Sequence, residues 1–205
     1  MRSGTNFTKF LLEENYMVRV MANALGWKHG EYPHHLPKTV SIIVTIKHPL
    51  AWLVSSCRDR TNVKSIGIDD FRCWLKQPEG VEQMDLWSMR NRYWIENAKR
   101  PLTVFRYIDL LENPQQTLDK AAEENDWQPY PKPFTNTNKV VGRGDELIKI
   151  EDLPFDSDFY TKKKFLNFYG EEELSLAKKH IDLDLASSLG FEVGYEGLEP
   201  STTCV

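Results

Sequence analysis

Apolar residues recur at steps of three and four along residues 7–25, the spacing that places side chains on one face of a helix. The sequence therefore predicts a first helix that starts at the Thr-Asn pair and stops at Gly26. The pattern changes at residues 39–46, where TVSIIVTI is mostly β-branched and apolar. Such a run is typical of a central parallel strand that is covered on both faces.

A helix is expected directly after this strand, in HPLAWLVSSCRDR at 48–60, because Pro49 suits a first helical turn. Residues 68–98 carry aromatic side chains at helical steps. They predict a helical insertion of two helices, broken near Pro78 and Gly80. The tryptophans of this insertion wall a pocket or pack its core, and helical spacing favours packing.

A second strand is predicted in LTVFRY at 102–107, before a helix with Asn113 as its N-cap. Residues 128–160 are rich in Pro, Asn, Asp and Gly and predict a loop, whereas residues 162–191 return to helical periodicity. Residues 194–205 lack periodicity and are expected to be a disordered tail. Strands that alternate with helices predict an α/β fold with a parallel sheet, which binds ligands at the carboxyl ends of its strands.

Composition narrows the class of protein. With 205 residues and 40% hydrophobic residues the chain suits a single domain with a proper core. A formal net charge of −4 argues against nucleic acid as a partner. The three cysteines form no metal-binding or disulfide pattern, which favours a reducing compartment and hence the cytoplasm. The longest apolar run is far shorter than the roughly 20 residues of a membrane span, and a secretory leader is not evident.

Two stretches carry candidate chemistry. A loop that enters a helix can direct several backbone N–H groups at one anion, and the helix dipole assists. The alternative for this loop is an ordinary helix cap. In the second stretch, Lys47 and Ser55 would place a charge and a hydroxyl beside the start of one helix, as a terminal phosphate requires. The alternative is a lysine that reaches solvent and a serine bonded to its own helix. The loop residues are Arg2, Ser3, Gly4, Thr5 and Asn6.

Together, MRSGTN and KHPLAWLVS resemble the sulfotransferases that use 3′-phosphoadenosine 5′-phosphosulfate (PAPS). The family's loop reads Pro-Lys/Arg-Ser-Gly-Thr-Thr, and its second motif is Arg-x-Pro followed by a serine on the next helix. FRYIDLLENPQQTL also resembles the family's Arg-Tyr-Glu-Asp-Leu segment, with Ile108 where Glu is common. The three segments occur in the family's order, so the resemblance extends over residues 2–193.

The resemblance implies a three-layer P-loop-like fold, with a central parallel sheet flanked by helices, in one domain over residues 1–193. It implies that residues 2–6 hold the 5′-phosphosulfate and that Lys47 and Ser55 hold the 3′-phosphate. Lys47 replaces the family's arginine and keeps the charge without the planar fork. The family's loop follows a first strand, whereas only Met1 precedes Arg2 here. Either a truncated chain or a sheet without that strand would weaken donor binding.

The expected activity is in-line transfer of a sulfuryl group from PAPS to a hydroxyl or amine of a small molecule or glycan, without a metal. His29 is the first candidate for the general base and His35 the second, each with a surface histidine as the alternative. Lys28 would contact the transferring sulfuryl oxygens as a point charge, with a solvated lysine as the commoner alternative, and Arg2 adds a permanent charge. Lysines 162–164 would cover the nucleotide or form a solvated face, and their adjacency favours the face.

Two other functions stay open at this point. One is a catalytically impaired nucleotide-binding or interaction module derived from the same fold, which a missing first strand would favour. The other is a P-loop kinase, which is disfavoured because RSGTNF lacks the Gly-Lys-Ser/Thr ending that binds phosphates and Mg²⁺.

Overall fold

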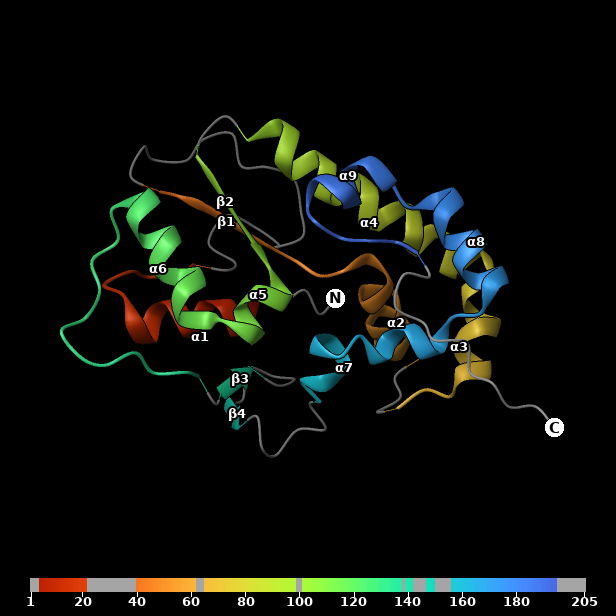
Figure 1. Cartoon of the computed structure of the whole chain (residues 1–205), viewed down its shortest axis with the longest axis horizontal. Helices are drawn as coiled ribbons and strands as arrows, with labels where there is room; N and C mark the ends of the chain where they lie inside the picture. The colour runs from red at the N-terminus through yellow and green to blue at the C-terminus, as the bar shows by residue number, and fades with distance from the viewer. Residues whose placement is uncertain are drawn as a thin grey trace.

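The computed structural model describes residues 4–21, 40–61, 65–98, 101–137, 139–141, 147–149 and 156–194. Its described part is a mixed α/β structure, mostly helical, around a small parallel sheet (Figure 1). The helices are α1 (Thr5–Asn15), α2 (Pro49–Arg60), α3 (Ile68–Leu75), α4 (Pro78–Asn97), α5 (Tyr107–Glu112), α6 (Pro114–Asn125), α7 (Asp158–Thr161), a 3₁₀ helix (Lys164–Phe168), α8 (Glu171–His180) and α9 (Leu183–Ser188).

The sheet consists of β1 (Ile42–Ile46) and β2 (Leu102–Arg106), which pair in parallel with Val44 opposite Val104. Both strands were predicted, and the α/β class is confirmed. Over the described ranges this sheet has two strands, so a three-layer P-loop-like arrangement stays a prediction. An antiparallel pair, β3 (Lys139–Val141) and β4 (Leu147–Lys149), lies in the segment predicted to be a loop, as does α7.

Two large hydrophobic cores hold the strands between them, and a smaller cluster surrounds Ile42 of β1. One is formed by α1, α5 and α6 with Phe105 of β2, and the other by α2, α3, α4, α8 and α9 with Ile46 of β1. These helix groups lie on opposite sides of the strand pair in Figure 1. The carboxyl end of β1 therefore enters the second core directly, and this places Lys47, the next residue, inside the protein.

The first helix is shorter than predicted, because α1 ends at Asn15. The Asn15 side-chain amide donates to the carbonyls of Leu11 and Thr135, both at 2.8 Å, and its oxygen accepts from the Thr135 N–H at 2.7 Å. Tyr16 then adopts extended backbone and bridges to Pro129. Hydrogen bonds to a residue 120 positions away thus end the helix, although the helical spacing of apolar residues continues beyond Asn15. The predicted stop at Gly26 lies outside the described residues.

The helical insertion is confirmed as two helices, α3 and α4, and Pro78 marks the start of the second. Gly80 lies within α4 instead of at the break. A Cβ at this position would lie 2.4 Å from the carbonyl oxygen of Trp74, so glycine allows the two helices to meet closely. Trp74 and Trp87 are buried in the core, as helical spacing indicated.

The second strand ends at Arg106, and Tyr107 already belongs to α5. The helix after Asn113 begins with Pro114 in its first turn, as predicted. Residues 162–191 contain the 3₁₀ helix, α8 and α9. The expected disordered tail lies outside the described residues apart from Gly194. Of the helices described, none is both long and apolar enough to cross a membrane.

Candidate functional site

The candidate site residues divide into two groups. Gly4, Thr5, Asn6, Lys47 and Ser55 belong to the part of the chain that the structure describes. The remaining candidates lie outside the described residues, so their roles stay predictions; they are Arg2, Ser3, Lys28, His29 and His35.

Lys47 and Ser55 meet at one hydroxyl group. The Lys47 ammonium donates to the Tyr160 hydroxyl at 3.0 Å, and Ser55 Oγ lies 3.3 Å from the same oxygen. Only 5% of Lys47 and 3% of Ser55 is exposed, so both side chains are buried and Lys47 does not reach solvent. The eight-residue spacing in the sequence therefore does bring the charge and the hydroxyl together.

Local structure explains how the two side chains are positioned. Lys47 follows β1 directly, and the indole N–H of Trp87 donates to its carbonyl at 3.1 Å. His48 caps α2 by accepting from the Leu50 N–H at 3.2 Å, and its other ring nitrogen donates to the carbonyl of Glu192 at 2.9 Å. With Pro49 in the first turn, α2 starts at a fixed angle to the strand. Ser55 lies two turns into that helix.

Ser55 is also bonded to its own helix, as the alternative interpretation of this serine expected. Ser55 Oγ donates to the carbonyl of Ala51 at 3.0 Å, so its lone pairs are available to an incoming donor. The Tyr160 hydroxyl accepts a hydrogen bond from Lys47, and in its contact with Ser55 either hydroxyl can donate. The phenol oxygen thus lies against both polar side chains.

Two tyrosine rings enclose the Lys47 ammonium. Its nitrogen lies 4.5 Å from the centroid of Tyr107 and 4.7 Å from that of Tyr160, and the two rings meet edge to face at 82°. No carboxylate of the described residues forms an ion pair with Lys47. Cation–π attraction of about 2 kcal/mol per desolvated contact offsets only part of the cost of burying a charge. An anion at this place would complete the compensation.

The charges around Tyr160 act on its phenol. Burial raises the pKa of Tyr160, but the positive charge of Lys47, the hydrogen bonds from Lys47 and Ser55, and the charge of Arg58 together bring it below its usual value. Burial also raises the pKa of Tyr107, which has no such compensation. The environment of the Tyr160 oxygen thus favours negative charge.

The N-terminus of α1 lies against the same aromatic cluster. Gly4 has φ 86°, and a Cβ there would lie 2.4 Å from Cδ2 and 2.6 Å from Cε2 of Tyr107. The Thr8 hydroxyl is 2.8 Å from that of Thr45, which ties α1 to β1. The two sequence motifs are therefore separated by one tyrosine ring. A ligand with two anionic ends is the kind of molecule that such a pair of sites can hold.

The first turn of α1 bears on the alternative interpretation of residues 2–6 as an ordinary helix cap. The N-cap residue is Gly4, and no side chain of the described residues caps this end of α1. The N–H groups of a first helical turn have no acceptor within their own helix, and they carry the positive end of the helix dipole. The positive end of the α1 dipole thus lies beside the aromatic cluster, where it suits an anion.

Sequence reasoning missed both tyrosines. Tyr107 belongs to the FRYIDLL segment, whose resemblance was noted without a role for this ring. Tyr160 falls in the segment predicted to be a loop, and no periodicity marks it. Lysines 162–164 are exposed, and Lys162 and Lys164 pair with Asp158 and Asp156 at 2.8 and 3.0 Å, which is the arrangement of a solvated face.

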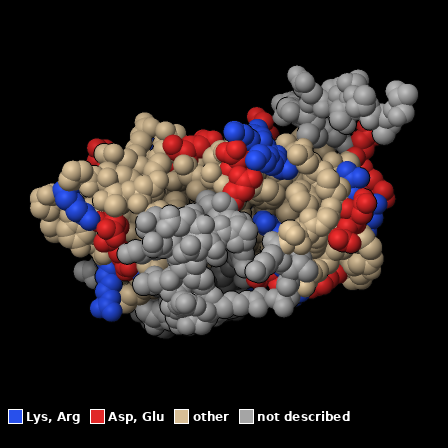
Figure 2. Space-filling view, turned by 90° about the horizontal axis from the view of Figure 1, so that it is seen from below, with Lys and Arg blue, Asp and Glu red and all other residues tan. Residues whose placement is uncertain are grey.

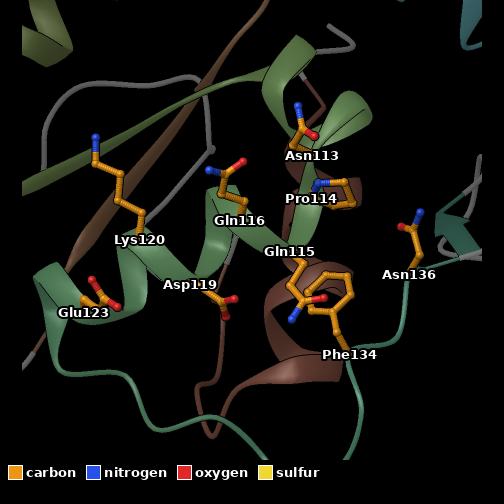
Figure 3. A pocket seen from close by; sticks show the side chains of 9 residues that line it. All are labelled: Asn113, Pro114, Gln115, Gln116, Asp119, Lys120, Glu123, Phe134 and Asn136. Carbon is orange, nitrogen blue, oxygen red and sulfur yellow. The ribbon is translucent and has the colours of Figure 1, made fainter.

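A separate open groove of about 750 Å³ runs along α6 (Figure 3). Amide and carboxylate side chains line it together with Phe134. Lys120 is its basic residue, beside Asp119 and Glu123, so the groove does not suit a polyanionic nucleotide. On the face displayed in Figure 2, basic and acidic side chains are interspersed. Within the described ranges, no three His, Cys, Asp or Glu residues are grouped to hold a metal ion.

Comparison with family models, curated proteins and solved structures gave no significant match to the chain.

Proposed function

We propose that the chain is a sulfotransferase that moves a sulfuryl group from PAPS to a hydroxyl or amine acceptor. The observation that carries this proposal is the convergence of buried Lys47 and Ser55, one tyrosine ring away from the N-terminus of α1. A buried cation without a described carboxylate partner favours an anionic ligand. The motif resemblance selects PAPS among such ligands.

The residues present fit the donor at both of its charged ends. Lys47 offers a point charge, and Ser55 can turn its O–H from the Ala51 carbonyl towards a terminal phosphate oxygen. Gly4 keeps a Cβ out of the space beside Tyr107, and Thr5 and Asn6 follow it in the first turn of α1. When bound, PAPS supplies a sulfuryl group activated by its phosphate leaving group.

The chemical step in this proposal uses residues outside the described part. His29, with His35 as the second candidate, takes the proton of the acceptor, and Lys28 and Arg2 stabilise charge on the leaving oxygen. The acceptor is a small molecule or glycan. The reaction needs no metal, and the proposed location is the cytoplasm, since the cysteine pattern favours a reducing compartment.

The test is release of 3′,5′-adenosine bisphosphate from PAPS in the presence of a panel of phenols, amines, sterols and oligosaccharides. Lys47→Met removes the buried charge with little change in volume, and Lys179→Met removes an exposed charge on α8 as the matched control. We expect turnover in the wild type and the control, loss in Lys47→Met, and no effect of a magnesium chelator.

Two results would redirect the proposal. Strict dependence on Mg²⁺ with ATP as donor would indicate a kinase. Binding of the bisphosphate without turnover of any acceptor, with His29→Ala indistinguishable from wild type, would leave a nucleotide-binding module that lacks the transfer reaction.

A further inference from the structure

Tyr160 already fills the position that an anion would take. Its hydroxyl oxygen lies 3.0 Å from the Lys47 ammonium and 3.3 Å from Ser55 Oγ. A phosphate oxygen bound by the same two side chains would need nearly the same point in space. The phenol and the phosphate therefore exclude each other.

We propose that Tyr160 is an internal competitor for the anion site, and that its hydroxyl leaves Lys47 and Ser55 when a terminal phosphate binds. The inference rests on the proposed function, in which that phosphate belongs to the nucleotide donor. It adds a regulatory element, because the affinity for the nucleotide is then set partly by how firmly Tyr160 is held.

The exchange of partners favours the phosphate on electrostatic grounds. Both bonds are charge-assisted because the Lys47 ammonium is the donor, but a phosphate also presents a charged oxygen and so adds the attraction of opposite charges. Departure of the phenol clears the space beside Ser55, which can then turn its O–H from the Ala51 carbonyl towards a phosphate oxygen. The lowered pKa of Tyr160 is consistent with a site that attracts negative charge.

The element that carries Tyr160 is short. Helix α7 has four residues, of which Phe159 and Tyr160 are partly buried against the cores. The ion pairs that join this segment, Lys162 to Asp158 and Lys164 to Asp156, are exposed on its surface. Exposed pairs of this kind contribute little to stability, because solvent screens the charges. Phe159 packs on Phe165 and Phe168, so the ring of Tyr160 can leave while its neighbour keeps α7 attached.

The variant Tyr160→Phe tests whether the Tyr160 hydroxyl competes with the phosphate or helps to bind it. The substitution keeps the ring that packs against Tyr107 and removes only the oxygen. Tyr130→Phe, which deletes an exposed hydroxyl, is the matched control. If Tyr160 competes, its loss tightens binding of 3′,5′-adenosine bisphosphate by about tenfold or more, the equivalent of one hydrogen bond to a charged group. Binding of 5′-AMP, which lacks the 3′-phosphate, stays unchanged.

The experiment is calorimetric titration of the wild type and both variants with the bisphosphate and with 5′-AMP. Weaker binding by Tyr160→Phe would overturn the proposal and make the hydroxyl a ligand of the phosphate. Equal binding would also overturn it. Absence of binding to every folded protein would instead refute the proposed function, and the competitor role with it.

A second measurement keeps the Tyr160 hydroxyl. A chain with 3-fluorotyrosine at position 160 alone, shown to unfold like the wild type, is titrated with the bisphosphate while its ¹⁹F resonance is followed. We expect a saturable shift that 5′-AMP does not produce. A resonance that stays in place while calorimetry reports bisphosphate binding would contradict displacement of Tyr160.

Discussion

Gly4→Ala should destabilise the protein because it affects both the backbone and the tyrosine cluster. The φ of 86° at Gly4 lies in the left-handed region, where a Cβ costs about 1–2 kcal/mol. That Cβ would also lie 2.4 Å from Cδ2 of Tyr107, and overpacking of this kind costs about 1–3 kcal/mol. The sum is about 2–5 kcal/mol, which corresponds to a fall in Tm of roughly 4–20 °C for a chain of this size.

The assay is thermal unfolding of Gly4→Ala beside Gly194→Ala. Gly194 has no positive φ, and a Cβ there would meet nothing within 4 Å, so its replacement should leave Tm unchanged or slightly raised. Because Tyr107 covers the Lys47 ammonium, Gly4→Ala should also weaken binding of a bisphosphate more than its loss of stability explains. Equal Tm values for the two variants would refute the inferred contact between Gly4 and Tyr107.

The remaining predictions concern pH, a side-chain amide and a second glycine. Burial lowers the pKa of His48 to about 4, although its hydrogen bond to the Glu192 carbonyl opposes the shift. As the pH falls, His48 is therefore protonated in the unfolded chain before it is protonated in the folded chain. Stability should therefore decline by up to about 3 kcal/mol from pH 6.5 towards 4, and His48→Asn, which can still cap α2, should flatten that slope in denaturant titrations; an unchanged slope would contradict this assignment. Asn15→Ala removes three hydrogen bonds and should cost about 2–3 kcal/mol in urea unfolding; a cost near zero would show that these bonds do not end α1. Gly80→Ala should lower Tm through contact with the α3 carbonyls, and an unchanged Tm would contradict that close approach.

Elements with strong local signals were predictable from the sequence. The β-branched run at 42–46 forms β1, and the proline-led segment after it forms α2 with Pro49 in its first turn. Residues 68–98 form two helices divided at Pro78. In each case periodicity or a proline constraint agrees with the tertiary contacts, so local and global preferences coincide.

Features fixed by distant contacts were not predictable. Helical spacing continues beyond Asn15, but the bonds of this side chain to Thr135 end the helix there. The position of Gly80 depends on how closely α4 approaches the end of α3. Neither contact has a signature within a short window of sequence.

The candidate site shows the same division. The spacing of Lys47 and Ser55 indicated a shared position, and the structure brings them to one oxygen. This oxygen belongs to Tyr160, which lies 105 residues beyond Ser55. The spacing of residues around Lys47 gives no information about so distant a partner. The ring of Tyr107, which joins the loop of α1 to Lys47, was equally hidden, because a buried tyrosine after a strand is a common core residue.

The most direct test of the central claim is the affinity of the folded protein for 3′,5′-adenosine bisphosphate relative to 5′-AMP, measured by calorimetry on the wild type, Lys47→Met and Lys179→Met. If Lys47 and Ser55 hold a terminal phosphate, the wild type and Lys179→Met prefer the bisphosphate by about tenfold or more, and Lys47→Met loses that preference. Equal affinity for the two nucleotides in the wild type, or a preference that survives Lys47→Met, would contradict a phosphate site at Lys47.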